Sequence, residues 1–158
     1  MQMNQYQPIV EAINHHVSLF NLYLTDAHQL PQVSFDRPKT SAWIEDSTWG
    51  GETWPSKDSY GVYFLVGHRQ NTPDDHGVYI GKASLKQIGH RIWNHLKPGK
   101  GTGRYTKIAP DGSTFCLQML LAVPMPTDQM RSFASALEEH LITSLRSEHY
   151  LLNRTGNR

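Results

Sequence analysis

The stretch that most constrains this chain is residues 77–95, which read GVYIGKASLKQIGHRIWNH. Its apolar start predicts a buried strand, and Gly81 and Lys82 predict a tight turn at the end of that strand. The apolar spacing that follows predicts an amphipathic helix. Arg91 and His95 are four residues apart, so a helix stacks them on one edge of its apolar stripe. That stripe is expected to consist of Leu85, Ile88, Ile92 and Leu96. Because the strand also carries a tyrosine, the stretch predicts a polar cluster.

The segments around this stretch predict a small α+β domain. Residues 60–68 and 114–123 are apolar, β-branched and aromatic, which is typical of buried strands. Residues 70–76 are rich in turn formers, so the strands on either side are expected to form an antiparallel hairpin. A helix is expected from residue 127 or 128 to about 149, with a buried stripe of Met130, Phe133, Ala134, Leu137, Leu141 and Leu145. The order hairpin, helix, strand, helix predicts a small antiparallel sheet flanked by helices.

The N-terminal part is expected to be a helical extension of this domain. Residues 8–28 predict a helix whose apolar stripe is Val10, Ile13, Val17, Phe20 and Leu24. Packing of that stripe on the core is the preferred interpretation, and a dimer contact is the alternative. Residues 29–59 hold several prolines, glycines and tryptophans without a clear period, which predicts a loop-rich connector with one short strand around residues 42–44.

Length and composition favour one globular domain. The chain has 158 residues, of which 38% are hydrophobic, enough to build a proper core. Its single cysteine excludes an internal disulfide and a four-cysteine zinc site, and fits a reducing compartment. No apolar run approaches the roughly 20 residues that span a bilayer, and the N-terminus lacks the pattern of a signal peptide. We therefore expect a cytoplasmic protein without a membrane segment.

Positive charge is concentrated in one part of a nearly neutral chain, whose net charge is +1. Residues 76–110 contain no Asp or Glu, and their cations are Lys82, Lys86, Arg91, Lys97, Lys100, Arg104 and Lys107. Such a block is typical of a surface that meets a polyanion, and a solvated basic face is the alternative. Glycines within residues 97–104 would let the backbone approach phosphates. We expect DNA contacts from Lys86, Lys97, Lys100, Arg104 and Lys107.

The last predicted helix carries two adjacent acids that its periodicity separates. Relative to Leu137, Glu138 lies about 100° around the helix, at the margin of the apolar stripe, and Glu139 lies about 200° around, toward solvent. A carboxylate at the margin of a core stripe is suited to line a site or to bind a metal ion. An ordinary glutamate at the helix border is the alternative.

Several short motifs follow one another along residues 59–153. They are a GVY triplet ending at Tyr63, a YIG triplet beginning at Tyr79, Lys82, Arg91 and His95 with three residues between them, Leu137-Glu138 before Leu141-Ile142, and Leu152-Asn153. Each triplet alone is a weak signal, but the ordered set is specific, and it resembles the GIY-YIG nucleases. The resemblance implies that family's fold for residues 59–158, with residues 1–58 as an extension packed on the core. The spacer over residues 64–78 is longer than in compact members, so we expect a larger hairpin loop.

The resemblance also implies roles for individual residues. Glu138 would hold one divalent cation, Mg²⁺ or Mn²⁺, and Arg91 would clamp the phosphate oxygens. Tyr63 would position or deprotonate the attacking water. Tyr79, His95 and Lys82 would organise the network, and Asn153 would fix the local geometry by hydrogen bonds. Tyrosine is a poor base at its ordinary pKa of about 10, so cations must assist it.

The sequence therefore predicts a hydrolase, a divalent-metal-dependent DNA endonuclease. A stand-alone chain of this size fits a restriction-type enzyme, and a restriction role would favour a homodimer, because a two-fold protein matches a palindromic site. One alternative is a DNA repair or phage nuclease with structure rather than sequence specificity. The other is a nucleic-acid-binding module that has lost catalysis. The choice between DNA and RNA stays open at this point.

Overall fold

The computed structural model of the chain describes residues 5–35, 40–44, 54–96 and 105–153. Within these residues, six strands form one sheet in the order β1-β5-β2-β3-β6, with β4 also paired to β5. The strands are β1 (Ser41–Trp43), β2 (Gly61–Arg69), β3 (Thr72–Ala83), β4 (Thr106–Ile108), β5 (Thr114–Pro124) and β6 (Tyr150–Leu151). The helices are α2 (Gln7–Asn21), α3 (Ile88–Leu96) and α4 (Phe133–Leu145), with the short 3₁₀ helices η1 (Asp26–His28) and η3 (Asp128–Ser132).

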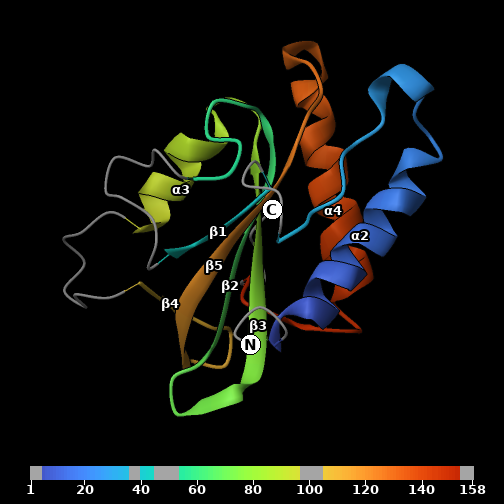
Figure 1. The fold of residues 1–158 in the computed structure, drawn as a ribbon. Coiled ribbons are helices and arrows are strands. Elements are labelled where there is room, and N and C mark those ends of the chain that lie inside the picture. The colour runs from blue at the N-terminus through green and yellow to red at the C-terminus, as the bar shows by residue number, and fades with distance from the viewer. Residues whose placement is uncertain (1–4, 36–39, 45–53, 97–104, 154–158) are drawn as a thin grey trace.

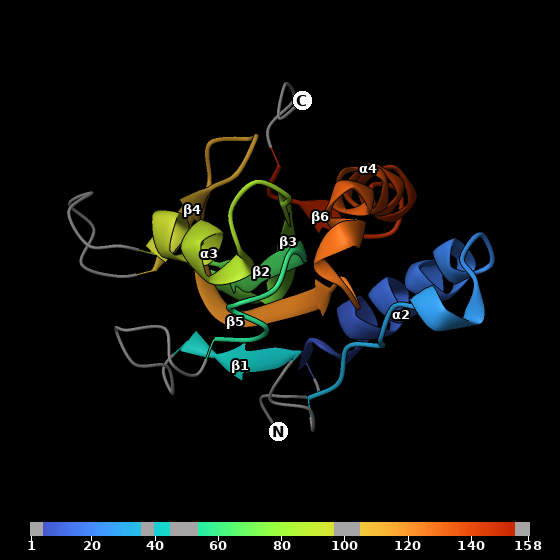
Figure 2. The same cartoon turned by 90° about the horizontal axis from the view of Figure 1, so that it is seen from above.

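The helices cover both faces of the sheet. α2 and α4 lie side by side on one face, and α3 lies on the other (Figures 1 and 2). Alternation along β2 divides the core: Val62, Phe64 and Val66 pack toward α2 and α4, whereas Tyr63 and Leu65 pack toward α3. The α+β class is confirmed. None of the described helices is long and apolar enough to cross a membrane.

The sheet is mixed, so the expectation of a purely antiparallel sheet was wrong. β6 pairs in parallel with β3, at Gly77↔Tyr150 and Val78↔Leu151. A parallel pair needs a long crossover, and the chain between β3 and β6 supplies one that includes α3, β5 and α4. A strand of two residues shows no periodic pattern, so the sequence offered no signal for β6.

α2 packs on the core of its own chain, as the preferred interpretation predicted. Its buried side chains are Ile9, Val10, Ile13, His16 and Val17, and they share one core with α4 and the sheet. The helix ends at Asn21 rather than near residue 28. The Asn21 side chain donates to the carbonyl of Leu30 at 3.1 Å and accepts from its N–H at 2.7 Å. Asn14 makes the same two bonds with Val33, at 2.8 and 2.7 Å, so the chain folds back along the helix.

The N-terminal part also contributes a strand to the sheet. β1, predicted around residues 42–44, pairs with β5 at Ser41↔Leu121 and Trp43↔Met119. Residues before 59 thus share both the sheet and the core with the rest of the chain. The boundary after residue 58 stays a prediction.

The β2–β3 hairpin does not carry the larger loop that the long spacer predicted. Only residues 70–71 separate the two strands. Pairing of β3 with β2 is continuous from Ala83 back to His76, and it then skips residues 73–75. Pro73 has no N–H to donate, and a strand tolerates proline at such an irregularity. The extra residues therefore lengthen the strands, and the turn itself stays tight.

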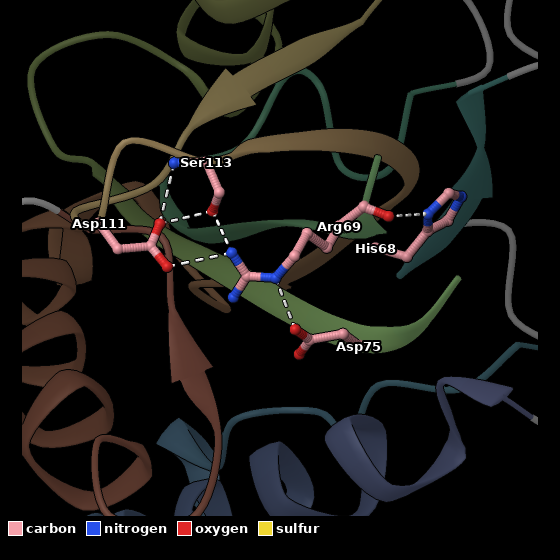
Figure 3. A network of polar contacts seen from close by, with 5 residues as sticks. All are labelled: His68, Arg69, Asp75, Asp111 and Ser113. Atoms are coloured by element: carbon pink, nitrogen blue, oxygen red, sulfur yellow. Dashed lines mark hydrogen bonds and ion pairs between the residues drawn. The ribbon is translucent and has the colours of Figure 1, made fainter. Parts of the chain in front are cut away.

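Arg69, at the end of β2, connects this hairpin to the turn between β4 and β5 (Figure 3). Its Nε donates to Asp75 at 2.6 Å, and its Nη1 donates to Asp111 at 3.0 Å and to the Ser113 hydroxyl. The guanidinium also lies over the Phe115 ring, 4.9 Å from its centroid. Two carboxylates and an aromatic ring thus hold one side chain, which joins two segments that lie about forty residues apart in the chain.

α3 begins at Ile88, three residues later than predicted, and Leu85 is 86% exposed rather than buried. The N–H of Ile88 donates to the carbonyl of Ser59 at 2.9 Å. The N–H of Gly89 donates to the carbonyl of Lys57, also at 2.9 Å. Because the first N–H groups of a helix have no partner within the helix, these carbonyls cap α3 and set its start.

The C-terminal helical segment is also shorter than residues 127–149. It begins with the 3₁₀ helix η3 and continues as α4 from Phe133, which is 42% exposed rather than buried. A 3₁₀ turn has three residues per turn, so a stripe drawn with the α-helical period loses its phase there. The other stripe residues are buried as predicted: Met130, Ala134, Leu137, Leu141 and Leu145.

Candidate active site

Tyr63, Tyr79 and His95 lie together on the α3 side of the sheet. Tyr63 comes from β2, Tyr79 from β3, and His95 from the last turn of α3. Tyr63 Oη lies 2.9 Å from His95 Nε2, and the Tyr63 side chain is completely buried. The His95 ring centroid lies 4.9 Å from that of Tyr79 and 5.7 Å from that of Tyr63. The three predicted residues thus form one aromatic cluster with a hydrogen bond inside it.

Gly81 makes room for the Tyr63 ring. The strand register places Gly81 directly opposite Tyr63. A Cβ atom on Gly81 would lie 2.3 Å from Tyr63 Cζ and 2.4 Å from Tyr63 Oη, far inside the usual contact distance of about 3.5–4.0 Å. The ring therefore lies against bare backbone, which only glycine offers.

Arg91 lies beside the Tyr63 hydroxyl, one helical turn before His95. Its charge and a side-chain hydrogen bond both act to lower the pKa of Tyr63. In the part of the chain that the structure describes, Arg91 Nε is buried and has no hydrogen-bond partner. A buried donor without an acceptor costs about 1–3 kcal/mol, so this N–H is suited to an oxygen that comes with a ligand.

Burial controls the protonation of the Tyr63–His95 pair. Burial, assisted by Tyr79, raises the pKa of Tyr63 above its ordinary value, and Arg91 only partly opposes this. Burial and the charges of Lys107 and Arg91 lower the pKa of His95 to about 4. At neutral pH the free protein therefore holds a neutral tyrosine against a neutral histidine.

Glu138 reaches the site at the outer edge of β3. It lies on α4, where it is half-buried, while its neighbour Glu139 is exposed, as the periodicity predicted. Burial raises the pKa of Glu138, against the charge of Lys82, a hydrogen bond from the Lys82 backbone and the charge of Arg91. The Lys82 side chain is exposed. The charges of Lys82 and Arg91 thus both favour the ionised carboxylate, and the backbone of the strand edge donates to it.

Asn153 occupies the same edge of β3, two residues further back. Its side-chain oxygen accepts from the N–H of Ile80 at 2.9 Å, and its side-chain nitrogen donates to the Ile80 carbonyl at 2.8 Å. The N–H of Leu152 donates to the carbonyl of Val78 at 2.8 Å. Asn153 thus extends the β6–β3 ladder by one step toward the site, which agrees with a role in fixing local geometry.

Lys107 belongs to this cluster, although its charge alone placed it in the predicted DNA-binding set. Its ammonium lies 4.1 Å from the Tyr79 ring centroid, and Lys107 Nζ lies 3.5 Å from His95 Nδ1. It is carried by β4, a strand of three residues that periodicity did not detect. Of the other predicted DNA contacts, Lys86 is exposed just before α3, and Lys97, Lys100 and Arg104 lie outside the described residues.

Glu138 is the residue of this cluster that could bind a metal ion. No group of three His, Cys, Asp or Glu side chains suited to a metal occurs within the described residues. A protein cage for zinc or calcium would need such a group. Mg²⁺ in phosphate chemistry keeps several waters and takes one or two carboxylates together with substrate oxygens, so a single half-buried carboxylate fits that kind of site.

No family model, no curated protein and no solved structure matches this chain.

Proposed function

We propose that this protein is a divalent-metal-dependent endonuclease with the GIY-YIG fold, which hydrolyses phosphodiester bonds in DNA. The observation that carries the proposal is the buried Arg91 Nε, which has no partner among the described residues and lies beside the Tyr63–His95 hydrogen bond. A phosphate oxygen would supply the acceptor that this donor lacks. The ordered motifs of the sequence lead independently to the same residues.

In this proposal Arg91 binds a non-bridging oxygen of the scissile phosphate and neutralises the charge that grows there. Its planar guanidinium suits that task. Tyr63 positions the attacking water and takes its proton. Because burial raises the pKa of Tyr63, the tyrosine needs nearby positive charge in order to act as a base. Arg91 supplies part of that charge in the free protein.

Glu138 holds the metal ion in this proposal, together with oxygens of the substrate. When bound, Mg²⁺ or Mn²⁺ would stabilise negative charge on the phosphate and the leaving oxygen. A cation beside Glu138 would also favour the ionised carboxylate, against the burial that raises its pKa. On the edge of β3, Asn153 hydrogen-bonds the backbone of Ile80, and the backbone of Lys82 donates to the Glu138 carboxylate.

The proposal is tested by incubating supercoiled plasmid with the protein and Mg²⁺, beside E138A and the matched control E139A. The two positions are adjacent on α4, but only Glu138 reaches the site. We expect E138A to lose at least about 10²-fold of the cleavage rate, since one group that stabilises the transition state contributes about that much. E139A should cleave like the wild type, and EDTA should stop all cleavage.

Two outcomes would contradict the proposal. Cleavage that survives E138A, or that E139A abolishes, would overturn the assignment of Glu138. Retained DNA binding without cleavage under Mg²⁺ or Mn²⁺ would favour the non-catalytic binding module. Defined product bands would indicate a restriction-type enzyme, and parallel reactions with RNA would decide the substrate class.

A further inference from the structure

We propose that Lys107 is a positioning residue that fixes the tautomer of His95, so that His95 donates its Nε2 proton to the oxygen of Tyr63. The inference deepens the proposed nuclease function and rests on it for its catalytic consequence. The tautomer itself is a property of the protein alone. It can therefore be tested whether or not the chain cleaves DNA.

The geometry leaves His95 between one cation and one hydroxyl. On one side, His95 Nδ1 lies 3.5 Å from Lys107 Nζ. On the other side, His95 Nε2 lies 2.9 Å from Tyr63 Oη. The ammonium also lies 4.1 Å from the Tyr79 ring centroid, a cation–π contact that holds it over the cluster. β4 carries Lys107 to this position through its pairing with β5, at Lys107↔Phe115.

The direction of the hydrogen bonds follows from what each group can do. A lysine ammonium has three donors and no acceptor, so it can only donate to His95 Nδ1. Nδ1 must then present its lone pair, and the ring proton of the neutral imidazole must be on Nε2. Nε2–H consequently donates to Tyr63 Oη. Burial and the charges of Lys107 and Arg91 keep His95 neutral at pH 7, which leaves a single ring proton to place.

In this arrangement the Tyr63 oxygen accepts a hydrogen bond from His95, and Arg91 acts in the same direction by lowering the pKa of Tyr63. Hydrogen bonds donated to an oxygen favour its ionised form. In the opposite tautomer Nε2 would be an acceptor, and the Tyr63 hydroxyl would donate to His95 instead of accepting a hydrogen bond from it. Lys107 thus selects the hydrogen-bond direction in which Tyr63 can serve as the base.

The tautomer can be read by nitrogen NMR on protein labelled at histidine, because a protonated ring nitrogen and one with a lone pair resonate far apart. The chain has nine histidines, so the His95 signals are assigned by their loss in H95Q. At pH 7 we expect the lone pair on Nδ1 in the wild type. In K107M, which keeps the length of the side chain but removes its charge, we expect the proton to move to Nδ1 or to be shared. K107R should preserve the wild-type pattern.

The same spectra give a second readout through a pH titration. The groups that face His95 are Tyr63, Tyr79, Arg91 and Lys107, and the two cations lower its pKa. K107M should therefore raise the pKa of His95 from about 4 toward its ordinary value. K86M removes an exposed lysine of the same basic block and should leave both the tautomer and the titration unchanged.

Cleavage assays then separate this inference from the proposed function. If the protein is a nuclease, K107M should slow cleavage by about 10–100-fold, as is usual when a group that orients a site residue is lost, and K107R should restore most of the rate. A wild-type His95 protonated on Nδ1, or a tautomer that K107M leaves unchanged, would overturn the inference even if DNA is cleaved. Absence of cleavage with the expected tautomer would overturn only the nuclease proposal.

Discussion

Gly81 is the position where the smallest change should do the most damage to the site. In G81A the new methyl carbon would lie 2.3 Å from Tyr63 Cζ, whereas carbon atoms normally come no closer than about 3.5–4.0 Å. The backbone cannot relieve the clash, because Gly81 and Tyr63 are paired across β3 and β2. The Tyr63 ring must therefore move by about 1 Å or more.

The size of the effect follows from that displacement. A shift of about 1 Å would stretch the 2.9 Å bond between Tyr63 and His95 to nearly 4 Å, where no hydrogen bond remains. A misplacement of about 1 Å at a reacting group costs about 10²-fold in rate. Overpacking a filled core costs about 1–3 kcal/mol, and Tyr63 is completely buried, so the free energy of unfolding should fall by that amount.

G77A is the matched control, because it adds the same methyl group to the same strand. Its Cβ would lie 2.8 Å from Phe115 Cε2 and 2.9 Å from Leu152 Cδ2, and no atom of Tyr63 or Tyr79 is among its nearest neighbours. Both variants should lose stability in urea titrations, but only G81A should lose cleavage. G81A should also raise the pKa of His95 from about 4, because a displaced ring opens His95 to water. Equal cleavage rates for G81A and G77A would refute the reasoning.

Three further predictions concern stability. First, the pKa of His95 is lowered to about 4 on folding, so the unfolded chain binds a proton first as the pH falls below 6.5. The free energy of unfolding of the wild type should therefore fall by about 3 kcal/mol more than that of H95F between pH 6.5 and pH 4 in urea titrations. Parallel curves of the free energy of unfolding against pH for the two proteins would contradict this. Second, N153A would leave the buried N–H and carbonyl of Ile80 without their partners, and should lower the free energy of unfolding by about 2–4 kcal/mol in thermal or urea unfolding. An unchanged free energy of unfolding would show that water replaces the amide. Third, R69M keeps the apolar stem of Arg69 but removes its hydrogen bonds to Asp75 and Asp111. Backbone hydrogen exchange should therefore speed up in the β2–β3 turn and in the β4–β5 turn. Unchanged exchange would show that this network does not stabilise the two turns.

Much of the fold could be predicted from the sequence, because its long elements have strong local patterns. The apolar runs of β2 and β5 and the stripes of α3 and α4 each repeat over several residues, so their type could be predicted. Their ends could not, since capping groups come from elsewhere in the chain. The carbonyls of Lys57 and Ser59 set the start of α3 by accepting hydrogen bonds from its first N–H groups, and no local sequence pattern indicates these hydrogen bonds.

The sequence also identified most residues of the candidate site, because the ordered motifs place Tyr63, Tyr79, Arg91, His95 and Glu138 on elements of known type. Alternation along a strand and the 3.6-residue turn of a helix then decide which side chains can face one another. Both are properties of the chain within one element. They hold before any tertiary contact forms.

Only the tertiary structure decided what completes that cluster. Lys107 reaches His95 because β4 pairs with β5, and a strand of three residues leaves no periodic trace in the sequence. The sequence motif named Asn153, but only the structure shows that its side chain pairs with Ile80 on β3, just beyond the end of β6. Such contacts depend on strand register between segments that lie far apart in the chain, and register is set by packing rather than by local residue preference.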